Sequence, residues 1–187
     1  MTKIYLASKS PRRQELLNLM GLTYNLLLKE VDESYPENLT LTEVAAYISA
    51  VKAKAFDMQP DGLILTADTV VIIDGEILGK PINNQQAIEM LKKLSGKMHQ
   101  VITAFSIAYK NKITTYSDTT DVYFKTLSDQ QISHYVNTYK PFDKAGAYGV
   151  QEWMGLVAIE KIVGSYTNVM GLPTEKLYST LQQMGIV

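Results

Sequence analysis

The chain has 187 residues, a length that suits one or two modest domains and leaves room for a substantial core. Its 18 Lys and Arg residues nearly balance 19 Asp and Glu residues, which argues against general binding to nucleic acid or to a membrane surface. The absence of cysteine excludes disulfide bonds, thiolate zinc sites and a cysteine nucleophile. Because no apolar run could cross a bilayer and the first residues lack a long hydrophobic region, we expect a cytoplasmic protein.

Strand patterns and helix patterns alternate along the chain. In chain order, the sequence predicts a strand at 3–8, a helix at 11–20, a strand at 24–29, a helix at 40–56, a strand at 63–67, a hairpin at 69–79, a helix at 84–94, a long hairpin at 100–117, strands at 121–127 and 156–162 with a helix at 132–139 between them, and a closing helix at 173–184. Capping boxes at Thr40/Glu43 and Ser128/Gln131 mark two helix starts, and Asp74 begins a favoured two-residue turn. With no repeat or linker, this order predicts a single domain over residues 1–187, an α/β fold around a mixed sheet.

The first predicted helix carries an unusual pair of charges. Ser10 suits the N-cap and Pro11 the first turn, which places Arg12 and Arg13 at the positive end of the helix macrodipole, where acidic residues are preferred. A phosphate held by the helix amides, the Ser8 and Ser10 hydroxyls and the two guanidinium groups would relieve that conflict. Two simpler interpretations remain open: both arginines could be solvated or paired with surface acids, or "SPRR" could be a phosphorylation site.

Two lysines are further candidates for binding an anion. Lys52 lies at the edge of the apolar stripe of the helix at 40–56, where a lysine that merely lays its stem on the core would also be found. Lys80, in "LGKP", follows a hairpin strand, and a lysine in such a loop is a weak signal on its own.

Acidic residues supply the other half of a candidate site. Asp68 comes directly after the buried run "LILTA", and a carboxylate at the end of an inner strand favours a ligand site, although a turn or cap aspartate is the alternative. Asp32 and Glu33 lie in the polar loop at 31–38 and could reach the same place. Together with Asp68 they could give oxygen ligands to Mg²⁺ or Mn²⁺, although spacing alone favours solvated loop charges for the pair.

Seven ordered motifs give the chain a resemblance to the Maf family of nucleoside triphosphate pyrophosphatases. In chain order they are "LASKSPRRQELL", "VDE", "VKAKA" with Lys52, "ADTVV", "GKP", "DKAGAYGVQ" and "GSYTNVMGLP", which all lie between residue 4 and about residue 174. The resemblance implies a fold similar to inosine triphosphate pyrophosphatases, with a mixed sheet flanked by helices and two lobes around a deep cleft. It also implies hydrolysis between the α- and β-phosphates of a nucleoside triphosphate, assisted by a divalent metal, Mg²⁺ or Mn²⁺.

The same resemblance implies a role for individual residues. The triphosphate would be held by Ser8, Arg12, Arg13, Lys52 and Lys80. Glu33 and Asp68 would serve the metal, and Asp68 would also accept the proton of the attacking water. Arg12, Thr69 and Gln151 match positions linked to substrate choice, and the motif "DKAGAYGVQ" is similar to that of the dTTP/UTP branch of the family rather than the 7-methyl-GTP branch.

The chemistry of the substrate agrees with these roles. Attack by water on an α-phosphorus is limited mainly by electrostatics, so fixed cations lower the barrier and no covalent nucleophile is needed. Gln151 carries both a donor and an acceptor, which could read two adjacent positions on a uracil or thymine edge, although a glutamine that ties a loop to its own backbone is the simpler interpretation.

Two other classes of function are alternatives to a nucleoside triphosphate pyrophosphatase. A nucleotide-binding regulator of cell division would bind the triphosphate with little turnover, whereas an enzyme would release pyrophosphate. A nucleic-acid-binding module would use the arginines on backbone phosphates, but the near-zero net charge argues against it. We therefore expect a nucleoside triphosphate as the partner, no nucleic acid, no membrane, and a homodimer as the resemblance implies.

Overall fold

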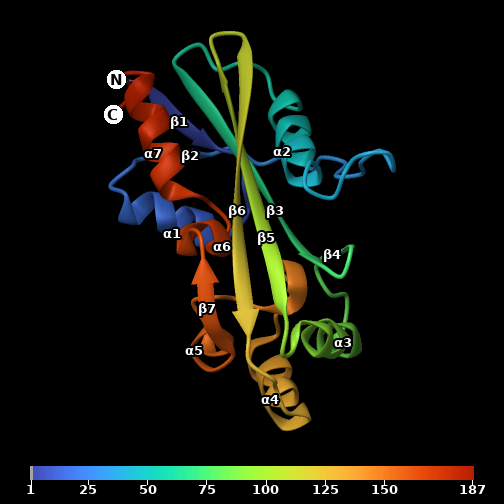
Figure 1. The fold of residues 1–187 in the computed structure, drawn as a ribbon. Helices are drawn as coiled ribbons and strands as arrows, with labels where there is room; N and C mark the ends of the chain where they lie inside the picture. The colour runs from blue at the N-terminus through green and yellow to red at the C-terminus, as the bar shows by residue number, and fades with distance from the viewer. Residues whose placement is uncertain (1) are drawn as a thin grey trace. The chain divides into compact units, whose positions relative to one another are not determined.

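The computed structural model describes residues 2–187 as a mixed α/β fold, which confirms the expected class. Its strands are β1 (Lys3–Leu6), β2 (Asn25–Leu26), β3 (Gly62–Ile73), β4 (Glu76–Leu78), β5 (Met98–Tyr109), β6 (Lys112–Phe124) and β7 (Ile159–Val163). Its helices are α1 (Pro11–Leu19), α2 (Val44–Lys54), α3 (Asn84–Leu94), α4 (Asp129–Tyr139), the 3₁₀ turn η1 (Ala145–Ala147), α5 (Trp153–Val157), α6 (Tyr166–Met170) and α7 (Thr174–Gln183) (Figure 1). Among the described residues, no helix is both long enough and apolar enough to pass through a bilayer.

The strands form one mixed sheet in the order β2-β1-β3-β5-β6-β7, with β4 paired to β3. Strand β1 runs parallel to β2 and β3, whereas β3 and β4, and β6 and β7, are antiparallel. The β3–β4 hairpin turns at Asp74 and Gly75, which both have positive φ, as the sequence predicted. Lys110 and Asn111, also with positive φ, connect β5 to β6.

Contacts between residues divide the chain into two compact units, and each of the long strands β3, β5 and β6 gives residues to both. Unit 1 contains Met1–Asp68, Thr103–Asp118 and Gly171–Val187, and unit 2 contains Thr69–Ile102 and Thr119–Met170.

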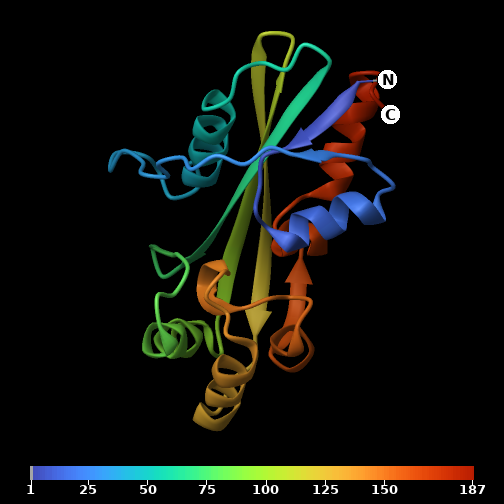
Figure 2. The same ribbon diagram turned by 180° about the vertical axis from the view of Figure 1, so that it is seen from behind.

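In unit 1, helices cover both faces of the strands. Helix α2 lies on one side of β1 and β3, and α1 and α7 lie on the other (Figures 1 and 2). Ala53 of α2 packs in one buried cluster with Ile64 of β3 and Ala108 of β5. Because side chains alternate along a strand, Thr66 and Asp68 share the face of Ile64, toward α2.

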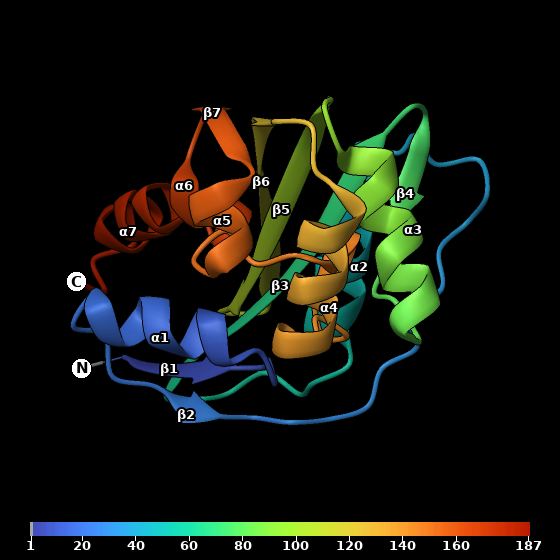
Figure 3. The same cartoon turned by 90° about the horizontal axis from the view of Figure 1, so that it is seen from below.

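In unit 2, α3 and α4 lie side by side (Figure 3). Leu91 of α3 and Ile132 and Tyr135 of α4 are completely or almost completely buried, as the apolar faces of two amphipathic helices require. The capping box predicted at Ser128 forms: its hydroxyl accepts from the Gln131 amide at 3.2 Å, and the Gln131 side chain accepts from the Ser128 amide at 2.9 Å.

Five local predictions are wrong. The helix predicted at 40–56 begins at Val44, with Glu43 as an N-cap that makes no capping hydrogen bond, and the Thr40 hydroxyl donates to Glu43 Oε2 at 2.7 Å instead of capping a helix. The separate strand predicted at 121–127 is the end of β6, which ends at Phe124.

In the other three cases, pairing with distant residues decides the outcome. The strand predicted at 24–29 is reduced to β2, because it pairs only with the end of the four-residue strand β1. The apolar run 156–162, predicted as a strand, is helical in α5 up to Val157, and β7 begins at Ile159, opposite Phe124 of β6. Asp68 does not follow a strand: β3 continues through it to Ile73.

Candidate active site

Ser8 organises the turn between β1 and α1. Its side chain is nearly buried, and Oγ accepts hydrogen bonds from the Ser10 amide at 3.2 Å and from Arg13 Nη1 at 3.3 Å. Ser10 occupies the N-cap position, as predicted, but its side chain makes no capping hydrogen bond. The first turn of α1 contains no acidic residue, so the positive end of the helix is suited to an anion.

Arg13 is fixed by oxygen atoms from three parts of unit 1. In addition to Ser8, its guanidinium donates to the Ala67 carbonyl through Nη1 at 2.9 Å and to the Gly171 carbonyl through Nε at 2.8 Å. Withdrawal from water lowers the pKa of Arg13, and the nearby Asp68 carboxylate opposes that shift. The interpretation of both arginines as solvated surface charges is therefore wrong for Arg13, whose guanidinium connects α1, β3 and the segment before α7.

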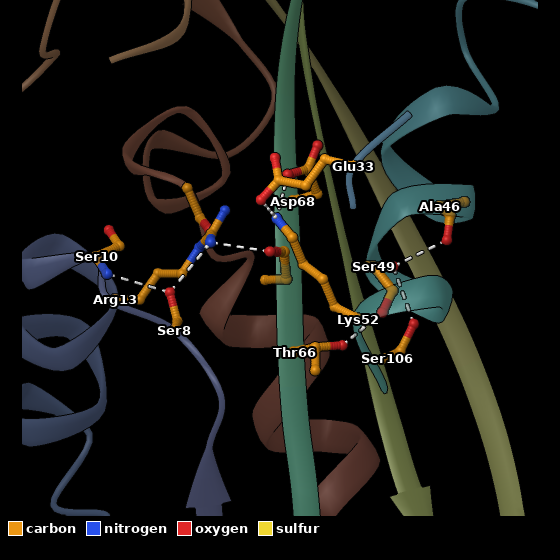
Figure 4. Close-up of polar contacts among 12 residues, drawn as sticks. Ser8, Ser10, Arg13, Glu33, Ala46, Ser49, Lys52, Thr66, Asp68 and Ser106 are labelled. Carbon is orange, nitrogen blue, oxygen red and sulfur yellow. Dashed lines mark hydrogen bonds and ion pairs between the residues drawn. The ribbon is translucent and has the colours of Figure 1, made fainter. Parts of the chain in front are cut away.

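Lys52 brings the two expected acidic residues together. Its Nζ lies 2.8 Å from Asp68 Oδ1 and 2.9 Å from Glu33 Oε1, so one ammonium joins α2, β3 and the loop at 31–38 (Figure 4). The side chains of Lys52 and Asp68 are 14% and 13% exposed, whereas that of Glu33 is half exposed. A lysine that only lays its stem on the core would extend to solvent, and that interpretation is wrong here. The turn or cap interpretation of Asp68 is wrong as well, because the residue lies inside β3.

A buried chain of hydroxyl groups sets the register of Lys52 against Asp68. Thr66 Oγ1 donates to the Ser49 carbonyl at 2.7 Å, and the Ser49 and Ser106 hydroxyls lie 2.9 Å apart (Figure 4). Lys52 follows Ser49 by almost one helical turn, and Asp68 follows Thr66 by one strand repeat on the same face. The contact between Thr66 and Ser49 therefore aligns the two charged side chains that come next in each element.

The residues around Lys52 are suited to a hard divalent cation. Among residues 2–187, no group of three or more His, Cys, Asp and Glu side chains has an arrangement that could hold a metal ion. Glu33 and Asp68 nevertheless place carboxylate oxygens around a single cationic atom. Two carboxylates suffice for Mg²⁺, which usually keeps several waters and takes further oxygens from substrate phosphates. Asp32 is used differently, because its carboxylate accepts from the amide and hydroxyl of Ser34, which lowers the pKa of Asp32.

Three expected site residues, Thr69, Lys80 and Gln151, belong to unit 2, whereas Arg12 in α1 belongs to unit 1. Thr69 follows Asp68 in β3, so its side chain lies on the opposite face of the strand. Lys80 is exposed and follows β4, and the Gly79 carbonyl before it accepts from the Gly146 amide at 3.1 Å. That hydrogen bond connects the Lys80 loop to the glycine-rich loop at 143–151, which ends at Gln151.

Gln151 has a feature that the sequence could not reveal. Its Oε1 is buried and has no hydrogen-bond partner among the described residues. A buried acceptor without a donor costs about 1–3 kcal/mol, so such atoms are rare in folded proteins and need an explanation. The buried Oε1 therefore does not tie the loop to its own backbone.

Two groups of functional contacts were missed by sequence reasoning. The carbonyls of Ala67 and Gly171 fix Arg13, and main-chain oxygens give no signal in a sequence. In unit 2, the buried Tyr135 and Lys144 and the partly exposed Glu152 form a polar cluster around the glycine-rich loop. A glutamate directly after "DKAGAYGVQ" was the one available hint to that cluster.

The fold is similar to a structure solved earlier. A structure of the Staphylococcus aureus Ham1 protein matches with a TM-score of 0.54 and 16% identity, covering 98% of this chain and 100% of that chain. At this identity the likeness shows the fold alone, in agreement with the central mixed sheet and flanking helices described above.

Sequence comparison gives the family. A protein of Phocaeicola vulgatus named dTTP/UTP pyrophosphatase is 48% identical over 185 residues, which are 97% of this chain and 96% of that protein. A protein of the same name from Flavobacterium psychrophilum is 49% identical over 179 residues, 95% of this chain and 92% of that protein. The family model described as Maf-like protein matches residues 3–184. The chain therefore belongs to the Maf family.

Proposed function

We propose that this chain hydrolyses dTTP and UTP between the α- and β-phosphates and releases the nucleoside monophosphate and pyrophosphate. The observation that carries the proposal is the position of the Lys52 ammonium between two carboxylates, in the same unit as the fixed Arg13 guanidinium. Cations and acidic groups held in place are what phosphoryl transfer requires. The names of the relatives, dTTP/UTP pyrophosphatases, support the substrate class.

In this proposal, five residues bind the triphosphate: Ser8, Arg12, Arg13, Lys52 and Lys80. Arg12 follows Pro11 in the first turn of α1, at the positive end of the helix, where a phosphate is favoured. Guanidinium groups match the geometry of phosphate oxygens better than ammonium groups do, because they donate through a planar fork. Lys80, exposed in its loop, would contribute a point charge.

Glu33 and Asp68, whose carboxylates both contact the Lys52 ammonium, would hold the divalent cation, Mg²⁺ or Mn²⁺. When bound, the cation supplies positive charge that stabilises the phosphoryl and leaving-group oxygens. Asp68, inside β3 and mostly buried, would also act as the general base. The attacking water gives its proton to the Asp68 carboxylate while its oxygen forms a bond to the α-phosphorus. The bond from that phosphorus to the bridging oxygen breaks, and pyrophosphate leaves with both bonding electrons.

Gln151 would read the base, assisted by Thr69 and Arg12. The unpartnered Oε1 of Gln151 can accept a hydrogen bond from the N3–H group of uracil or thymine. Cytosine has an acceptor at that position, so it would leave the buried oxygen unpaired or force the amide to turn. The cost of about 1–3 kcal/mol corresponds to a preference of roughly 5- to 150-fold for UTP over CTP.

The decisive experiment is turnover on a panel of nucleotides. Purified protein is incubated with Mg²⁺ and dTTP, UTP, CTP or 7-methyl-GTP, and pyrophosphate and monophosphate are quantified together. We expect equal amounts of the two products, with dTTP and UTP preferred. Tight nucleotide binding without release of pyrophosphate would instead identify a regulator. Sedimentation analysis of the same preparation tests the homodimer expected from the family resemblance.

A further inference from the structure

We propose that Tyr135, Glu152 and Lys144 form a positioning network that holds Gln151 in the orientation needed to select a pyrimidine. The proposal rests on the base-reading role proposed for Gln151 and extends it to three residues that do not touch the base. All four residues belong to unit 2.

Tyr135 is the centre of the network. The residue is completely buried in α4, and its hydroxyl donates to Glu152 Oε2 while accepting from the Gly149 amide at 3.0 Å. A tyrosine hydroxyl has one proton, and here that proton is committed to the carboxylate. The hydroxyl therefore fixes the chain on both sides of Gln151, two residues before it and one residue after it.

Lys144 fixes the other oxygen of the same carboxylate. Its side chain is 8% exposed, and Nζ lies 3.0 Å from Glu152 Oε1 and 2.7 Å from Asp143 Oδ1. Buried charges are expensive to desolvate and are kept where they are paired, often for the sake of a defined geometry rather than for stability. With one oxygen on Tyr135 and the other on Lys144, Glu152 has little freedom to rotate.

The backbone between these anchors is equally constrained. The Glu152 amide donates to the Gly149 carbonyl at 3.1 Å, which closes a turn with Gln151 as its third residue. A Cβ atom at Gly149 would lie 2.8 Å from Glu152 Cδ, so the carboxylate is packed directly against this glycine. Glu152 occupies the N-cap position of α5, but its side chain makes no capping hydrogen bond and contacts Tyr135 and Lys144 instead.

The unpartnered oxygen of Gln151 connects this rigidity to selectivity. A flexible loop would turn the amide until Oε1 found a donor in the protein or in water, because a buried unpaired acceptor is unfavourable. A constrained turn keeps the acceptor unsatisfied until a ligand brings the donor. Loosening the network should therefore reduce discrimination between UTP and CTP more than it reduces hydrolysis itself.

Tyr135→Phe is the first test, because it removes one hydroxyl and keeps the ring. Tyr139→Phe is the matched control: Tyr139 is on the same helix, is partly exposed and stacks on Tyr135 with ring centroids 5.0 Å apart. The ratio of kcat/KM for UTP to that for CTP is measured for both. We expect a roughly five- to tenfold fall in Tyr135→Phe, as the loss of one buried hydrogen bond implies, and no change in the control. If Tyr135→Phe fails to fold, Glu152→Gln takes its place, since the amide retains the shape and removes the charge.

A double variant separates positioning from a general structural effect. In the background of Gln151→Ala, adding Tyr135→Phe should leave the UTP to CTP ratio where Gln151→Ala alone puts it. If folded Tyr135→Phe kept the wild-type ratio of UTP to CTP, or if the ratio fell further in the double variant, the positioning role of Tyr135 would be overturned and the base-reading role of Gln151 would remain. An unchanged ratio in Gln151→Ala would overturn the base-reading role as well, so the two failures are distinguishable.

Discussion

Asp68→Asn separates chemistry from binding in the proposed mechanism. The amide has nearly the shape of the carboxylate, but it cannot accept a proton from water. General-base catalysis contributes about 10²–10⁴-fold, so we expect turnover of dTTP to fall by at least roughly 100-fold. Weaker placement of the divalent cation would increase that loss, because Asp68 is also one of its two proposed ligands.

The structure predicts that Asp68→Asn folds. Lys52 keeps the Glu33 carboxylate at 2.9 Å, and an asparagine oxygen can still accept from the ammonium that now lies 2.8 Å from Asp68. The contact from the ammonium to an amide oxygen is still a hydrogen bond to a charged group, a class that contributes about 1.5–3 kcal/mol, so the expected loss of unfolding free energy is at most about 1 kcal/mol. Binding of dTTP should be unchanged or tighter, because a negative charge beside the triphosphate has been removed.

The assay for this prediction pairs single-turnover hydrolysis of dTTP with calorimetric binding of dTTP in Mg²⁺. Asp61→Asn is a suitable control, because Asp61 also pairs with a lysine, Lys3, but at an exposed place. Retention of single-turnover hydrolysis within a few-fold of wild type by Asp68→Asn would refute the general-base role. Glu33 would then become the candidate base.

Three further variants examine individual contacts. Arg13→Ala leaves two main-chain carbonyls without their guanidinium donor, so urea unfolding should show a loss of about 1–3 kcal/mol. A ligand at a hundred times its dissociation constant stabilises a protein by about 2.7 kcal/mol, and this gain from dTTP should be smaller in Arg13→Ala than in the wild type. An equal gain in the two proteins would show that Arg13 does not contact the nucleotide. Lys52→Met removes the ammonium from between two carboxylates, so the nucleotide-free protein should bind Mn²⁺ about tenfold more tightly, a gain of about 1.4 kcal/mol. Electron paramagnetic resonance measures this binding. An unchanged Mn²⁺ affinity would show that the two carboxylates do not share a cation. Burial lowers the pKa of His99 to about 4, so the folded state resists a proton that the unfolded state takes up below about pH 6.5. The free energy of unfolding should therefore fall by about 2 kcal/mol between pH 7.5 and pH 5, and His99→Gln should reduce this pH dependence. His134→Gln, at an exposed histidine, is the control. The same pH dependence in both variants would show that His99 does not cause the effect.

Local chemistry made part of the fold predictable. The capping box at Ser128 depends on residues three positions apart, and the turn at Asp74 and Gly75 on two adjacent ones, so short sequence patterns suffice. The length of β2 could not be predicted in the same way, because it depends on how far β1 extends beside it. The continuation of β3 through Asp68 has a similar origin, since β4 pairs with the part of the strand beyond that residue.

The candidate site, like the fold, could be predicted from the sequence only in part. A strand-to-helix turn with two arginines is visible in the sequence, as is a carboxylate beside an apolar run. The partners of these groups are not: the Gly171 carbonyl is 158 residues from Arg13, and the Lys52 ammonium contacts a loop residue and a strand residue. Only the packing of α2 against β3, aligned by Thr66, brings those charges together. Residue types could be predicted, whereas contacts required the tertiary structure.

The conflict of charge at the start of α1 has a physical consequence for binding. Arg13 is held by three oxygens before any nucleotide arrives, so little side-chain entropy remains to be lost when an anion binds beside it. A fixed guanidinium also needs no reorganisation as charge develops on the phosphoryl oxygens. Lys52 differs, because the two carboxylates that now hold its ammonium are the proposed ligands of the divalent cation, and Lys52 would then bind the triphosphate. Of these two cations, Arg13 is thus the one whose position is set in advance, and Lys52 the one whose partner changes on binding.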